Sequence, residues 1–180
     1  MEKQNKTPVK NRWQPFKRFR KSEDGATAVE FAMICAPFFM IVGSIFEFAV
    51  AYLVQGMLHH GAADVARLVR TNQITAGTHT EAQFKQVVCG LPYMGLFDCE
   101  RLVVDLQTVA QFGAPGTPRN ADGTLNTQNM SFSPGGPNSI NVMRLYYEFP
   151  VLMAWMQGLG TDATPNGRLM TATQAFMIEP

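Results

Sequence analysis

The feature that most constrains the fold is a long apolar run near the N-terminus. Between Ala26 and Leu58 the only charged side chains are Glu30 and Glu47. A helix that crosses a bilayer needs about 20 predominantly apolar residues, and this run is longer. A cleaved secretory signal has an apolar core of about 7–15 residues, so this competing interpretation fits the length poorly. We therefore expect a transmembrane helix over residues 26–57.

The charged residues are distributed unevenly around this run. Residues 1–24 carry eight Lys and Arg side chains against three acidic ones, whereas the rest of the chain is net acidic. Because Lys and Arg are retained on the cytoplasmic side of a membrane, this predicts a cytoplasmic N-terminus and an exported C-terminal part. Aromatic residues among the basic ones would also suit nucleic acid. A segment lying on lipid headgroups explains the same composition, and we expect no nucleic-acid partner.

The remainder of the chain predicts an α+β domain. Apolar residues repeat at helical spacing over residues 58–70, which predicts an amphipathic extension of the helix. The exported domain is expected over residues 71–180, with a helix over 81–88 capped by Thr80. Strands are expected over 101–112, 140–150 and 168–178, a short helix over 151–159, and a long loop over 113–138. The predicted architecture is a long N-terminal transmembrane helix followed by a small antiparallel sheet of three or four strands.

The cysteines and histidines indicate a disulfide rather than a metal site. Cys89 and Cys99 lie ten residues apart in the segment assigned to the oxidising side, so we expect a disulfide, with two free thiols as the alternative. The adjacent His59 and His60 point about 100° apart on a helix and cannot form one metal site. The sequence has no Gly-rich phosphate loop, zinc-protease motif or nucleophile elbow. We therefore expect no metal, no cofactor and no enzymatic activity.

Several residues of the apolar run suggest more than anchoring. Gly25 would let a protease approach the backbone closely, and a carboxylate such as Glu30 inside an apolar helix is costly unless it is paired. Alternatively, Gly25 only begins the helix and Glu30 lies at the headgroup level. Glu47 lies about 30 Å further along the helix than Ala26, which predicts an interfacial position near the far membrane face, with a deeper position paired in the assembly as the alternative. Small residues recur every fourth position, a spacing that allows close helix packing in lipid: Ala28, Ala32 and Ala36.

These residues carry a resemblance to a known family. The segment Gly25-Ala-Thr-Ala-Val-Glu-Phe31, followed by Ala36-Pro37 and Glu47-Phe48, resembles the start of the TadE-like family. Members of this family are minor pseudopilins of the tight-adherence (Tad, Flp) adhesive pilus system. The ending Ala172–Pro180 is similar to the closing pattern of the family, with Ile178 in place of Asn.

The resemblance implies a role for each residue of the motif. It implies that a prepilin peptidase cuts between Gly25 and Ala26, which leaves residues 1–25 as a cytoplasmic leader. Glu30, followed by Phe31, would then pair with the new N-terminal amine of a neighbouring subunit during assembly.

The resemblance also implies a location and a set of partners. It implies a pilin-like, single-pass protein of the bacterial inner membrane with a periplasmic C-terminal domain, which either stays in the membrane or enters the pilus. The implied partners are membrane lipid, the prepilin peptidase, other pilin or pseudopilin subunits, and inner-membrane pilus assembly proteins. The alternative is an uncleaved single-pass envelope protein with an exported binding domain.

Overall fold

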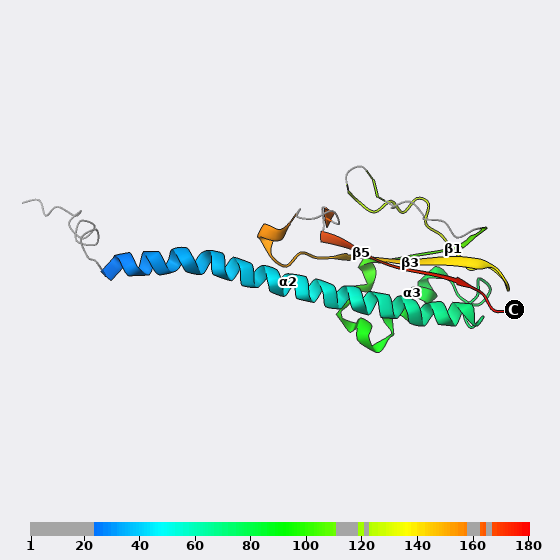
Figure 1. Ribbon diagram of the computed structural model, residues 1–180. Helices are drawn as coiled ribbons and strands as arrows, with labels where there is room; N and C mark the ends of the chain where they lie inside the picture. Colours follow the sequence, from blue (N-terminus) through cyan, green and yellow to red (C-terminus); the bar gives the residue numbers. More distant parts are fainter. Residues whose placement is uncertain (1–23, 111–118, 121–122, 158–162, 165–166) are drawn as a thin grey trace, which may run out of the picture. The chain divides into compact units, whose positions relative to one another are not determined.

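The computed structural model describes residues 24–110, 119–120, 123–157, 163–164 and 167–180 (Figure 1). Residues 1–23 of the expected leader lie outside the described residues. So do residues 113–118 and 121–122 of the expected loop. The chain forms two compact units, Met1–Gly43 and Ser44–Pro180, which are described separately.

One long helix contributes to both units. The helix α2 spans Asp24–Arg70, so the expectation of a long N-terminal helix is confirmed. Pro37 lies inside it without ending it, although proline removes the backbone donor to the carbonyl four residues earlier. The helix ends where Asn72 adopts a left-handed backbone conformation (φ 57°). Arg67 and Arg70 lie in its last turn, where positive charge complements the helix dipole.

A second, short helix and a disulfide follow. The helix α3 spans Glu81–Cys89 and begins with a capping box, in which the Thr80 hydroxyl accepts from the Gln83 N–H and the Gln83 side chain accepts from the Thr80 N–H. The helix and the cap predicted here are confirmed. Two 3₁₀ helices follow, η1 at Pro92–Leu96 and η2 at Cys99–Arg101. A disulfide joins Cys89 to Cys99, which confirms the expected bond.

The sheet has the strand order β2-β1-β3-β5-β4. Its strands are β1 at Leu102–Val109, β2 at Phe132–Ser133, β3 at Ile140–Phe149, β4 at Ala163–Thr164 and β5 at Gly167–Met177. The α+β class is confirmed, and the three long strands are antiparallel neighbours as predicted. The sheet differs in detail, because β2 pairs in parallel with β1 and makes it mixed. Strands of two residues, such as β2 and β4, carry no alternation that a sequence pattern would reveal. Within the helix expected over 151–159, the structure describes only the 3₁₀ turn η3 at Ala154–Met156.

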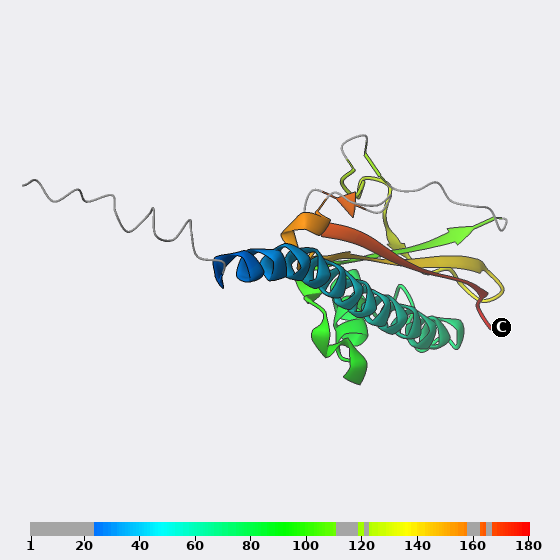
Figure 2. The same cartoon turned by 60° about the vertical axis from the view of Figure 1, so that its left-hand side comes forward.

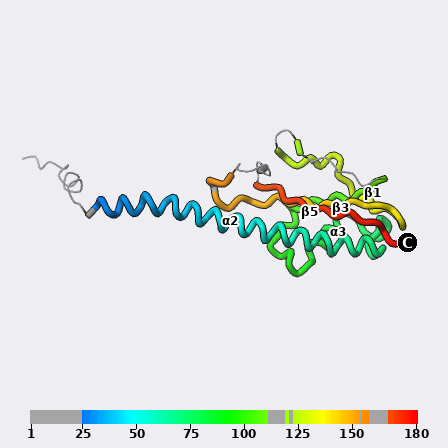
Figure 3. Tube along the Cα trace, in the orientation of Figure 1, coloured from blue at the N-terminus to red at the C-terminus, as the bar shows by residue number. Residues whose placement is uncertain are grey.

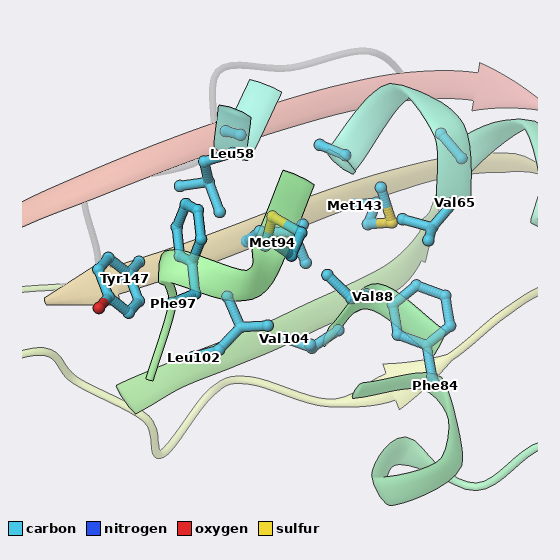
Figure 4. Packing of buried hydrophobic residues seen from close by; sticks show 14 of the residues in the cluster. Leu58, Val65, Phe84, Val88, Met94, Phe97, Leu102, Val104, Met143 and Tyr147 are labelled. Atoms are coloured by element: carbon cyan, nitrogen blue, oxygen red, sulfur yellow. The ribbon is translucent and has the colours of Figure 1, made fainter. Parts of the chain in front are cut away.

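Helices cover one face of this sheet (Figure 2). The C-terminal half of α2 runs along the three long strands, and α3 lies beside it on the same face (Figure 3). Alternate strand residues point into the core there, with Val104, Leu145 and Ala172 side by side across the sheet. Leu58 and Val65 of α2 meet the core residues of the strands, and Phe84 and Val88 enter it from α3 (Figure 4).

The other face of the sheet carries a buried ion pair. Asp105 on β1 lies directly opposite Arg144 on β3, and the Arg144 guanidinium lies 3.3 Å from the Asp105 carboxylate. The same carboxylate accepts from the Ser131 N–H (3.1 Å) and from the Gln107 side chain (2.7 Å). A charge this deeply buried is tolerated when its oxygens are paired. Asp105 therefore fastens the chain just before β2 to the sheet.

Candidate membrane anchor and assembly site

The first part of α2 has the properties of a membrane span. An 18-residue window of this helix has a mean hydropathy of 2.0, and none of that window is buried in the protein. Its large apolar side chains are exposed, for example Phe31 at 69% and Ile34 at 71%. The helix is therefore long and apolar enough to cross a bilayer.

The predicted processing residues lie at the very start of this helix. Because α2 begins at Asp24, both Gly25 and Ala26 belong to its first turn, and both are exposed. The first four N–H groups of a helix have no acceptor within it, so this turn is the easiest part of the helix to open. Cleavage between these two residues stays a prediction.

Glu30 and the predicted alanine stripe lie on different faces of α2. All four side chains are exposed. Each residue turns the helix by about 100°, so Ala28, Ala32 and Ala36 share one face. Glu30 follows Ala28 by two residues and points about 160–200° away from Ala28 and Ala32. A helix that packs against the alanines would therefore not be the one that meets the Glu30 carboxylate.

Glu47 has a different environment from Glu30. It is 3% exposed, and its carboxylate accepts a hydrogen bond of 2.8 Å from the backbone N–H of Met153. It is also the first residue of a buried stripe on α2 that continues through Ala51, Val54 and Leu58. The structure thus brings Glu47 together with the chain just after β3, a contact that sequence reasoning missed. An interfacial depth for Glu47 stays a prediction.

Other contacts at the same end of the domain involve aromatic side chains. The Trp155 indole N–H donates to the Ser44 hydroxyl at 3.3 Å. The Arg168 guanidinium carbon lies 5.2 Å from the centre of the Phe48 ring, a cation–π distance. Next to this pair, α2 and β5 border a groove of about 460 Å³ that Tyr52 and Gln55 also line.

The remaining polar side chains favour structural roles. His59 and His60 are exposed, and no three His, Cys, Asp or Glu side chains gather into a metal site in the part of the chain that the structure describes. The Tyr93 hydroxyl donates to the Asp64 carboxylate. Burial raises the pKa of Tyr93 to about 12, and the bond to the Asp64 carboxylate acts in the same direction. Neither this bond nor the Asp105–Arg144 pair was predicted. The signal for the latter was a charge of opposite sign in each of two predicted strands, but each strand also carries a second charge, Arg101 and Glu148 respectively, so the partners could not be assigned.

The comparison with known proteins agrees with the geometry of the helix. The family model described as TadE-like protein matches residues 25–67, from the predicted cleavage site to the last turns of α2. No curated protein and no solved structure matches the chain. The family is of a pilus structural type, and together with the candidate membrane helix it indicates a pilus-associated membrane protein of the Tad type. Residues 25–67 of the chain are therefore similar to the TadE-like family.

Proposed function

We propose that this protein is a minor pseudopilin-like subunit that supports assembly of a Tad/Flp-type adhesive pilus. A prepilin peptidase cuts it after Gly25, and Glu30 then guides the new N-terminus into the assembly. The observation that carries this proposal is the contrast between the two carboxylates of α2. Glu47 is buried and accepts a hydrogen bond from its own chain, whereas Glu30 is exposed on an apolar helix.

An unpaired charge on a membrane helix is costly. A carboxylate near the end of a membrane helix is tolerated best when a cation compensates it. Among the described residues, Glu30 forms no ion pair with another side chain of this chain. The amine of a neighbouring subunit, released at Ala26, is a cation of suitable size and depth. The separate face of the alanine stripe would contact a second neighbour, as a subunit within an assembly requires.

The charge distribution supports the orientation of the subunit. The basic residues 1–24 would hold the N-terminus on the cytoplasmic side of the inner membrane, which places the sheet domain in the periplasm. The Cys89–Cys99 disulfide is in keeping with an oxidising compartment. The proposed partners are membrane lipid, the peptidase, and other pilin or pseudopilin subunits with their inner-membrane assembly proteins.

The N-terminal residue of the protein extracted from its host membrane tests the processing step. Mass spectrometry should find Ala26 as the first residue, and Gly25→Leu should abolish that species. Gly56→Ala is the matched control, because an added methyl group there meets no neighbouring atom and should leave processing unchanged. An intact N-terminus in the native protein would instead indicate an uncleaved, single-pass envelope protein with an exported binding domain.

A second experiment tests the assembly step independently of cleavage. Glu30→Gln keeps the shape of the side chain but removes its charge, so the protein should still insert and be processed while piliation falls. Glu30→Asp, which keeps the charge, should retain more piliation than Glu30→Gln. Normal piliation in Glu30→Gln cells would refute charge pairing by Glu30.

A further inference from the structure

The chain immediately after β3 has the composition and the position of a second membrane contact. We propose that Leu152 and Trp155 insert into the headgroup region of the bilayer that α2 crosses, so that the exported domain rests on the membrane surface. This inference requires that α2 spans the membrane. It does not depend on cleavage after Gly25 or on a role in the pilus.

The burial of its residues places the membrane surface along α2. From Gly25 to Phe46 no residue of the helix is buried in the protein, and burial begins at Glu47. The stretch from Ala26 to Phe46 measures about 30 Å at 1.5 Å per residue, which equals the thickness of a typical hydrocarbon core. The span then ends near Phe46, before residue 57, and Glu47 lies at the outer surface.

One turn of the domain lies at this level of α2. The turn that contains η3 lies at the end of the sheet away from the C-terminus (Figures 1 and 2). It is held to α2 by the hydrogen bond from the Met153 N–H to Glu47 and by that from the Trp155 indole to Ser44. The two contacts fix this turn beside the residues of α2 that would emerge from the lipid.

This turn exposes two large apolar side chains. Leu152 is 53% exposed and Trp155 is 47% exposed, although both belong to a domain with a well-packed core. Among the described residues that follow α2, the other large apolar side chains exposed to a similar degree are Leu96 and Met177. Tryptophan with an apolar body and a polar N–H is typical of membrane–water interfaces.

Neighbouring side chains complete an interfacial surface. Phe48 and Tyr52 of α2 are exposed at the same end of the domain, 46% and 80% respectively. Arg168 lies over the Phe48 ring and supplies a cation for lipid phosphate. An aromatic and cationic rim of this kind favours a bilayer interface over a purely apolar protein partner.

Quenching of tryptophan fluorescence by brominated lipids tests the proposal. The chain has two tryptophans, so Trp13→Phe leaves Trp155 as the only one. In the full-length protein reconstituted into phosphatidylcholine–phosphatidylglycerol vesicles, Trp155 emission should be blue-shifted. Lipids brominated close to the headgroup should quench it more strongly than lipids brominated near the chain ends. Emission like that of a water-exposed tryptophan, with no quenching by either lipid, would overturn the proposal.

Two control proteins separate this outcome from a failure of α2 to insert. Both carry Phe at positions 13 and 155. Leu96→Trp in this background reports an exposed apolar position elsewhere in the domain and should not be quenched. Phe39→Trp reports the middle of the span and should be quenched most by bromine near the chain ends. If the Phe39→Trp protein is quenched but Trp155 is not, α2 spans the bilayer and only the proposed contact of Trp155 with lipid is refuted. If neither protein is quenched, α2 does not span the bilayer, and the inference loses its basis as well.

A third variant tests how the turn is held. Glu47→Ala removes the acceptor of the Met153 N–H, so the turn should lose its fixed depth and Trp155 should be quenched less by the shallow bromine. Unchanged quenching in Glu47→Ala would show that the lipid contact does not depend on the contact with α2, and it would overturn that part of the inference.

Discussion

Removing the Cys89–Cys99 disulfide should destabilise the unit Ser44–Pro180 by an amount that the length of the closed loop sets. The bond closes a segment with a sequence separation of 10 residues. The chain-entropy relation for a loop of this size gives about 2.7 kcal/mol at 25 °C. The closed segment also contributes Met94 (1% exposed) and Phe97 (8% exposed) to the core, so a reduced chain must order these side chains without the cross-link.

The perturbation is the double substitution Cys89→Ser and Cys99→Ser in the full-length protein in detergent micelles. Pulse proteolysis across a urea series should show a loss of roughly 2–3 kcal/mol, or a midpoint about 1 M lower. Wild-type protein treated with a reductant should show the same loss. Cys35→Ser is the matched control, because Cys35 is a free cysteine in the other unit and its loss should leave the midpoint unchanged.

Two results would refute this reasoning. If the double variant is as stable as the oxidised wild type, the loop does not depend on its cross-link. If thiol alkylation of the unreduced native protein labels both Cys89 and Cys99, the bond is absent from the protein in its membrane.

Three further substitutions test local features of the domain. Thr80→Ala removes the α3 cap and should cost about 1 kcal/mol in urea unfolding, with no loss if the cap is dispensable. Tyr93→Phe should cost roughly 1 kcal/mol near neutral pH. Because the folded state raises the pKa of Tyr93, its contribution is complete below pH 10.0 and is lost as the pH rises toward about 12. Wild type and variant should therefore converge at high pH, and a constant gap would exclude the Asp64 bond as the cause. A methyl group at Gly167 (φ 156°) would lie 2.2 Å from the carbonyl oxygen of Phe149, so Gly167→Ala should lower the melting temperature clearly, whereas Gly56→Ala in open space should not.

The elements that were predicted are those with a local cause. The capping box at Thr80 lies within four residues of sequence, and the strand-forming composition of β1 and β3 is a property of each strand by itself. The parallel strand β2 depends instead on Ser131, whose N–H is held by the Asp105 carboxylate 26 residues away. The short helix expected over 151–159 fails for a related reason. The Met153 N–H is taken by Glu47, 106 residues away, and the described part of this segment forms only a 3₁₀ turn.

The two carboxylates of α2 explain why the candidate site could be predicted only in part. In the sequence, Glu30 and Glu47 are each a single acid in an apolar helix, and a buried charge needs a partner. Glu30 was expected to pair in the assembly, whereas Glu47 was expected at the interface, with pairing in the assembly as the alternative. The partner of Glu47 is a backbone N–H of the same chain, and only the tertiary fold reveals it. Once that contact is known, Glu47 no longer calls for a second subunit, and the requirement for an external cation falls on Glu30 alone. The fold therefore sharpens the assembly hypothesis by removing one of its two candidates, and a Glu47 substitution that spares piliation while a Glu30 substitution abolishes it would bear this division out.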